Sequence, residues 1–194
     1  MQGTSQGICL RSYVTEYDNS FLKTAKIWEV ALATTAAPSF FEPLQLGGAF
    51  GSLLVDGAMG RNNPVSELWT EAKRQFRLTE TDRTLGCIVS VGTGVPNTKE
   101  LSFSVPGMAK GLGNIATDTE DMAKSFENQH ESWARNDQYF RFNPDRGAGE
   151  MRLDDVDQMR KSHDIVIGYV GQNRVARDLA ACAQVLKNKE IPCV

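Results

Sequence analysis

The spacing of apolar and polar residues along the chain predicts four short strands. Residues 7–15 alternate apolar and polar side chains, as a strand with one buried face does. Residues 53–55 and 85–91 are short, mainly apolar runs, which are typical of strands covered on both faces. Residues 139–143 predict a further short strand, closed by Pro144.

Helices are predicted where apolar residues recur every three or four positions, in residues 24–35, 64–76, 112–133 and 165–186, and another helix begins near residue 154. Thr24 is the expected N-cap of the first helix, and Pro38 stops it. Asn63 is the expected cap of the second, and Pro64 suits its first position because no hydrogen bond is lost there. Strands joined through helices predict parallel pairs and an α/β fold.

Three of these features need interpretation. The apolar face of residues 112–133 either packs against the sheet or forms a cap helix that meets lipid. Phe40 and Phe41 belong either to the core or to a surface that contacts acyl chains. The glycine-rich residues 47–52 lack the Lys-Ser/Thr ending of a phosphate-binding loop and precede a strand, so we interpret them as a connection.

Asp56 ends the run of residues 53–55 and is followed by Gly57 and Ala58. It therefore lies at the carboxyl end of a predicted strand, where open α/β sheets place their functional sites. Gly57 allows a sharp backbone turn. By itself, however, Asp-Gly after a strand indicates only a turn in which the Asp side chain accepts hydrogen bonds from nearby backbone donors. The choice between a site and a turn depends on the surrounding sequence.

The composition is that of an ordinary globular chain. The 194 residues are 41% hydrophobic and 23% charged, which allows a sizeable core. The net charge of −3 gives no basic footprint, so we expect no nucleic-acid partner and mainly apolar contact with any lipid. The two histidines lack ligands at metal-binding spacing, so we expect neither a metal nor another cofactor. Four scattered cysteines predict free thiols and an intracellular, cytoplasmic location.

Three segments resemble the patatin-like phospholipase family: WEVALATTAAPSFFEP at residues 28–43, LLVDGAMGRNNPV at residues 53–65 and IVSVGTG at residues 88–94. Arg11-Ser12-Tyr13 also matches the end of a strand that precedes them in the family. The resemblance implies that Asp56 is the second member of a Ser–Asp catalytic dyad. Gly57 and Ala58 complete its turn motif.

The resemblance also implies a fold and an activity. The family has a mainly parallel sheet with helices on both faces, a three-layer α/β/α arrangement. We expect residues 1–194 to be the carboxyl-terminal portion of a single patatin-like domain, incomplete and inactive alone, with the Gly-x-Ser-x-Gly nucleophile elbow and the Gly-rich oxyanion loop outside the chain. The implied reaction is hydrolysis of lipid or phospholipid esters in lipid degradation. The resemblance also implies peripheral contact with a membrane and further domains in a longer chain.

Two other interpretations stay open from the sequence alone. The chain can be a complete, non-catalytic relative that uses the fold for interaction. Alternatively, Asp56 is a turn residue in an unrelated α/β protein. A nucleophile elbow in upstream coding sequence would favour the enzyme, and an unrelated sheet order would favour the last interpretation.

Overall fold

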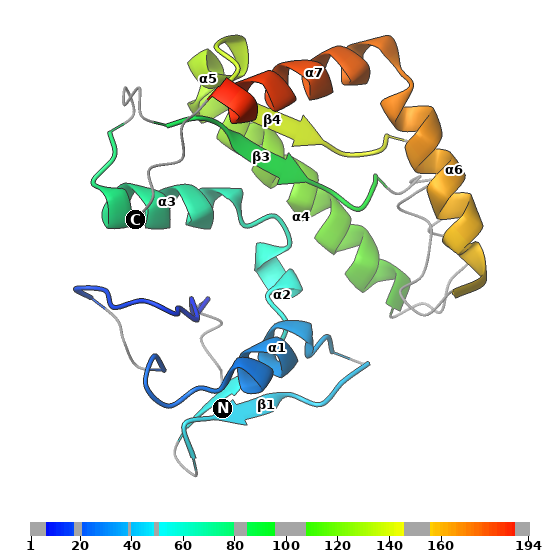
Figure 1. The fold of residues 1–194 in the computed structure, drawn as a ribbon. Coiled ribbons are helices and arrows are strands. Elements are labelled where there is room, and N and C mark those ends of the chain that lie inside the picture. Colours follow the sequence, from blue (N-terminus) through cyan, green and yellow to red (C-terminus); the bar gives the residue numbers. More distant parts are fainter. Residues whose placement is uncertain are drawn as a thin grey trace. The chain divides into compact units, whose positions relative to one another are not determined.

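The structure is a computed structural model that describes residues 7–17, 21–38, 40–48, 51–79, 85–95, 108–145 and 156–188. The chain divides into two compact units, residues 1–62 and residues 63–194. Figure 1 shows the elements of both units, which are described separately below.

The first unit contains helix α1 (Ile27–Thr35), strands β1 (Leu44–Leu46) and β2 (Ser52–Leu54), and the short helix α2 (Ala58–Arg61). β1 and β2 form an antiparallel pair in which Leu44 lies opposite Leu54. Ala33 and Ala36 are buried at α1 and just beyond its end, and Leu46 is buried in β1. Small side chains at these positions allow the helix to approach the hairpin closely.

A tight glycine turn joins β1 to β2. Gly47 and Gly48 have φ angles of 96° and 75°, which L side chains rarely adopt. Gly51 donates its backbone N–H to the carbonyl of Gly48 at 2.9 Å. A Cβ at residue 51 would overlap the carbonyl oxygen of Leu46. The connection predicted for residues 47–52 is therefore a hairpin turn, and it is too short for the crossover that a parallel pair requires.

Several predictions for this unit were wrong. Residues 7–17 contain no strand. The first helix begins at Ile27 instead of Thr24, because the Glu29 carboxylate accepts a hydrogen bond from the Lys26 backbone N–H at 2.7 Å and so closes the helix start there.

The strand before Asp56 also differs from its prediction. It spans Ser52–Leu54, and it is not covered on both faces, since Leu53 is 68% exposed. Phe40 and Phe41 are likewise exposed, so neither is a core residue of the described chain. A continuous apolar run did not reveal that this strand belongs to a two-stranded antiparallel sheet.

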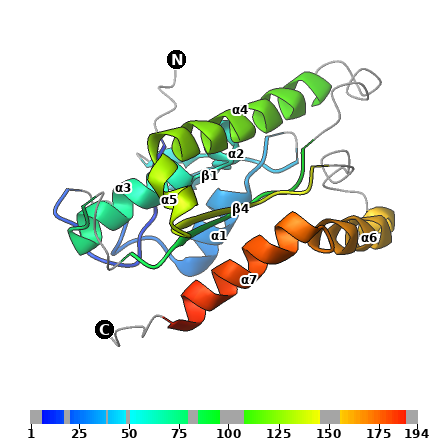
Figure 2. The same cartoon turned by 90° about the horizontal axis from the view of Figure 1, so that it is seen from above.

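The second unit contains α3 (Val65–Phe76), β3 (Ile88–Val91), α4 (Met108–Gln129), α5 (Glu131–Arg135), β4 (Tyr139–Phe142), the 3-10 helix η4 (Val156–Gln158), α6 (Met159–Val170) and α7 (Asn173–Asn188). β3 and β4 are a parallel pair in which Ile88 lies opposite Tyr139. In Figure 2, α4 and α7 lie on opposite sides of β4. The expected pairing of parallel strands with helices on both sides is present here, but β2 and β3 belong to different sheets.

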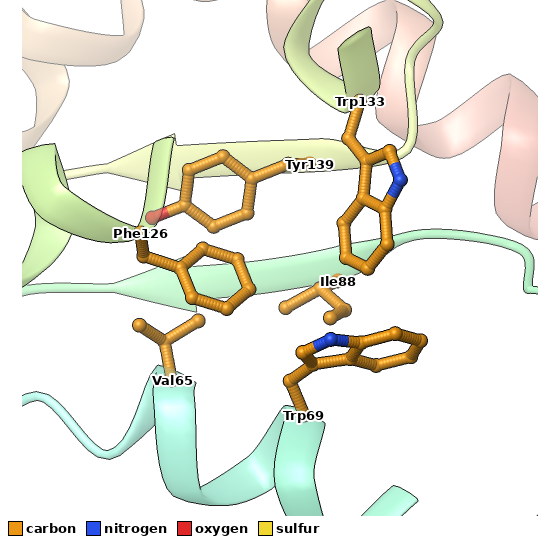
Figure 3. Close-up of a cluster of buried hydrophobic side chains, with 6 residues drawn as sticks. All are labelled: Val65, Trp69, Ile88, Phe126, Trp133 and Tyr139. Carbon is orange, nitrogen blue, oxygen red and sulfur yellow. The ribbon is translucent and has the colours of Figure 1, made fainter. Parts of the chain in front are cut away.

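The core of this unit gathers side chains from three helices and both strands (Figure 3), namely Val65, Trp69, Ile88, Phe126, Trp133 and Tyr139. The rings of Trp69 and Trp133 meet edge to face, with 4.7 Å between centroids. Phe126 from α4 is only 1% exposed. Of the apolar face predicted for residues 112–133, Phe126 and Trp133 lie in the core and Met122 packs against it. Gln129 is exposed, and the predicted single helix is divided into α4 and α5.

The predicted helix of residues 165–186 is broken in two. α6 ends at Val170 and α7 starts at Asn173, and Gly171 lies between them. On α7 the buried side chains are Val175 and Cys182, whereas Leu179 and Leu186 are exposed. The break changes which face of α7 is buried. The periodicity of apolar residues, counted through the break as one helix, therefore predicted the wrong buried residues on α7.

Candidate active-site segment

Asp56 lies two residues beyond β2 and is partly buried. Its backbone N–H donates to the carbonyl of Ala36 at 3.0 Å, which ties this turn to the end of α1. Its carboxylate Oδ1 accepts the backbone N–H of Ala58 at 2.8 Å. The side chain therefore satisfies a free donor in the first turn of α2, and the carboxylate orientation is fixed by a backbone group.

Gly57 does not adopt the unusual backbone conformation that was expected to produce a sharp turn here. Its φ of −62° and ψ of −15° are ordinary helical values that any L residue adopts. The positive φ in this segment is at Gly60, at 110°. A Cβ at residue 57 would meet only the Arg61 side chain, at 4.0 Å. The sharp turn after β2 is consequently not caused by the conformational freedom of Gly57.

A polar network lies at the carboxyl ends of β3 and β4 in the second unit. Asn143 Oδ1 accepts the Gly94 backbone N–H at 2.7 Å, and Asn143 Nδ2 donates to Glu120 Oε1 at 2.8 Å. Arg141 Nη2 pairs with the same Glu120 oxygen at 2.8 Å, and Arg141 Nη1 donates to Ser90 Oγ at 3.1 Å. The network holds the Gly-Thr-Gly turn after β3 against α4.

Sequence reasoning missed most of this network. The Glu120 side chain is only 26% exposed and pairs with Arg141, which is 14% exposed. The Gly-Thr-Gly turn of residues 92–94 was the available signal. Nothing in the spacing linked it to the acidic, basic and amide side chains of the network, which lie far from it in the sequence.

The two histidines lie in different surroundings. The His130 ring stacks on Trp133 at a centroid distance of 4.2 Å and lies 4.5 Å from that of Phe126. His163 is exposed, with Asp164 Oδ1 3.4 Å from its Nδ1. Within the residues that the structure describes, no group of three or more His, Cys, Asp or Glu side chains could hold a metal ion.

One expectation about the nucleophile needs correction from the sequence itself. Residues 3–7 are Gly-Thr-Ser-Gln-Gly, so Ser5 does have the Gly-x-Ser-x-Gly spacing. In a nucleophile elbow, a helix follows the serine directly. Residues 7–17 contain no helix, and Ser5 itself lies outside the described residues. The spacing is present, but it lacks the helix that defines an elbow.

None of the helices that the structure describes is both long enough and apolar enough to cross a membrane.

One segment of the chain matches a known protein family. Residues 11–69 match the patatin-like phospholipase family, and the match includes Asp56, Gly57 and Ala58. This confirms the resemblance. The helices with small parallel and antiparallel sheets are consistent with an incomplete α/β patatin-like fold. Residues 11–69 are therefore similar to part of a patatin-like phospholipase.

Individual proteins also match part of the chain. Calcium-independent phospholipase A2-gamma of Mus musculus and that of Homo sapiens are each 35% identical to the chain over 124 residues. The same protein of Oryctolagus cuniculus is 34% identical over 124 residues. Each match covers 61% of this chain and 14% of the relative, so the chain spans only a small part of the length of these relatives. No solved structure gives a significant match.

Proposed function

We propose that this chain contributes the Asp of a Ser–Asp dyad to a lipid acyl hydrolase that cleaves carboxylic esters of phospholipids or related lipids. The observation that carries the proposal is Asp56 in an Asp-Gly-Ala motif beyond β2, inside the segment that matches the patatin-like family. The hydrogen bond from Ala58 to Asp56 Oδ1 supports it, because a base must be held in one orientation to act.

The proposed reaction has two steps. A serine hydroxyl attacks the ester carbonyl carbon while Asp56 accepts the hydroxyl proton, and the leaving alcohol departs with that proton, which leaves an acyl-serine. Water then attacks the acyl-serine, with Asp56 as base, to release the carboxylic acid and restore the serine. Backbone donors of an oxyanion loop would stabilise the negative charge on the carbonyl oxygen.

The nucleophile of this proposal lies in a part of the complete protein that precedes residue 1 of the chain. The absence of a helix in residues 7–17 supports this choice over Ser5. We further propose phospholipid as substrate, peripheral contact with a membrane, a cytoplasmic location and additional domains in the complete protein. The names of the matching relatives support the substrate class.

A second candidate function is a non-catalytic interaction module. The lack of a defined elbow in the described residues favours it. It predicts no ester turnover by any version of the protein.

Esterase turnover of a short-chain chromogenic ester tests the proposal. We would compare the 194-residue chain with a version extended upstream, each with and without Asp56→Ala. We expect activity in the extended version and at least a ~100-fold lower kcat/KM after Asp56→Ala, because general base catalysis typically contributes that much. Asp118→Asn, at an exposed position of α4, is the matched control and should leave kcat/KM unchanged.

The outcomes separate the candidates. Retained activity in Asp56→Ala would contradict the catalytic role of Asp56. Activity in the unextended chain that is lost on Ser5→Ala would move the nucleophile to Ser5. Inactivity of every version would favour the interaction module.

A further inference from the structure

The end of α1 meets the Asp56 turn inside the first unit. Ala36 follows the last residue of α1, and it is only 2% exposed. Its main-chain carbonyl accepts the backbone N–H of Asp56 at 3.0 Å. A helix leaves its last carbonyls without partners of its own, so this contact supplies one of them with a donor. Both residues belong to the unit of residues 1–62, and the hydrogen bond acts directly on the residue that bears the candidate base.

A tight corner, residues 35–37, aims the Ala36 carbonyl away from the helix. The Ala37 N–H donates to the Thr35 carbonyl at 2.8 Å, and Ala36 between them has a φ of −74° and a ψ of 60°. This hydrogen bond and these angles define an inverse γ-turn. Since ψ in an α-helix is about −42°, the Ala36 carbonyl is rotated by roughly 100° from the direction of the helical carbonyls.

The neighbours of Ala36 make its carbonyl available to the Asp56 turn. The carbonyl before it is bonded within the γ-turn, and the carbonyl of Ala37 accepts the N–H of Phe40 at 3.1 Å. Pro38 favours the end of the helix here, because the residue before a proline avoids helical angles. The Ala36 carbonyl, in contrast, accepts its hydrogen bond from the turn beyond β2.

Asp56 is consequently held from two sides. Its main chain is bonded to Ala36, and its carboxylate Oδ1 accepts the Ala58 N–H at 2.8 Å. The side chain of Ala36 is buried, so a larger side chain at this position would push the corner away from the Asp56 turn. A small residue at position 36 therefore preserves the contact.

We infer that Ala36 is a positioning residue for Asp56: its rotated carbonyl holds the backbone of the Asp56 turn, and its small side chain keeps the corner close enough for that contact. The functional part of this inference rests on the proposed role of Asp56. The anchoring part does not, since it concerns a backbone hydrogen bond alone.

Amide hydrogen exchange of the 194-residue chain tests the anchor. Ala36→Val enlarges a buried side chain, and we expect the Asp56 amide to exchange about tenfold faster, because its hydrogen bond opens more easily. The Gly51 amide, which donates to the Gly48 carbonyl in the hairpin of the same unit, is the internal reference and should not change. Ala31→Val, the same substitution at an exposed position of α1, is the matched control and should leave both amides unchanged.

Ala37→Pro is a second variant, which serves if Ala36→Val does not fold. It removes the donor of the γ-turn and moves the ψ of Ala36 towards extended values of about 120–160°, which turns the carbonyl away from Asp56. It should likewise speed exchange at Asp56 more than at Gly51. Unchanged exchange at Asp56 in the folded variants, or an equal increase at Gly51, would overturn the inference.

The functional part has its own measurement in the extended, active protein. Ala36→Val should lower kcat several-fold and leave KM unchanged, as expected when only the catalytic geometry is disturbed. Ala36→Gly keeps the carbonyl without a larger side chain and should retain most of kcat. An unchanged kcat in Ala36→Val, with Asp56→Ala inactive, would overturn positioning by Ala36. Full activity of Asp56→Ala would instead overturn the proposed function and leave the exchange result to decide the anchor.

Discussion

At the scale of residues, Asp56 combines the two interpretations that its sequence allows. Its carboxylate does accept a backbone N–H, as the turn interpretation predicts, and Ala58 supplies that donor at 2.8 Å. The same contact fixes the carboxylate, which a catalytic base also requires. The geometry of Asp56 therefore fits both a turn residue and a catalytic base. The kinetics of Asp56 variants distinguish between these two roles.

Tyr139 permits a prediction about pH. Its burial in the core raises the pKa of its phenol above the ordinary value of 10.0. The unfolded chain then loses this proton at lower pH than the native chain, so Tyr139 contributes a stability that is complete below pH ~10 and is lost as pH rises through the native pKa. Urea denaturation between about pH 9 and 11 should show this fall in the free energy of unfolding.

Tyr139→Phe should make that fall shallower, since Phe has no proton to lose. Phe76→Leu, at an exposed position, is the control and should not alter the slope. Equal slopes for Tyr139→Phe and the parent chain above about pH 10 would contradict the assignment.

At the scale of elements, turns decide which strands pair. β1 and β2 are joined by a few residues and pair antiparallel, whereas β3 and β4 are separated by α4 and α5 and pair parallel. A short connection permits only reversal, and a parallel return requires a crossover of a dozen or more residues. The end of a helix likewise decides which residues are buried, because the break at Gly171 alters the face that α7 buries.

The hairpin turn gives a prediction at this scale. Gly51→Ala should lower the free energy of unfolding by about 1–3 kcal/mol, because its Cβ would overlap the carbonyl oxygen of Leu46 and force the backbone to move. Gly57→Ala is the matched control in the same unit, since its backbone is helical and the nearest atom lies 4.0 Å away. Urea denaturation should show a loss only in Gly51→Ala. A similar loss in both variants would mean that the turn is not the cause.

At the scale of the whole molecule, the described residues have one substantial aromatic core, in the second unit. It brings residues from α3 to β4, which are distant in sequence, into contact. The first unit buries mainly small residues and leaves Ile27, Trp28 and Leu32 of α1 exposed. Since burial of apolar surface is the dominant stabilising term, most of the stability of the described chain should come from the second unit.

Phe126→Ala tests this distribution. It should lower the free energy of unfolding by about 3–5 kcal/mol, because it removes a 1%-exposed ring from the centre of that core. Leu68→Ala removes a 53%-exposed side chain from α3 and should change it by less than ~1 kcal/mol. Equilibrium urea denaturation followed by near-UV circular dichroism would measure both. Equal effects would show that the core does not dominate stability.

The sequence by itself determined many of the elements and the resemblance of one segment to a known family. Local patterns predicted α3, β3 and β4 close to their observed positions. The expected cap was wrong by one residue, because the N-cap of α3 is Pro64 and the Asn63 Oδ1 accepts the N–H of Val65 from the position before it. The Asp-Gly-Ala motif could also be found without a structure, since it depends on adjacent residues. These features succeed because periodicity and turn chemistry act over a few neighbouring positions.

Only the tertiary structure decided which strands pair and which polar groups meet. Ser90, Glu120 and the neighbouring Arg141 and Asn143 come from three distant parts of the sequence, and their network exists because β3, β4 and α4 pack together. The exposure of Leu53 likewise follows from its two-stranded sheet, not from its apolar character. The physical reason is that burial and hydrogen bonding depend on neighbours in space, which a one-dimensional pattern does not specify.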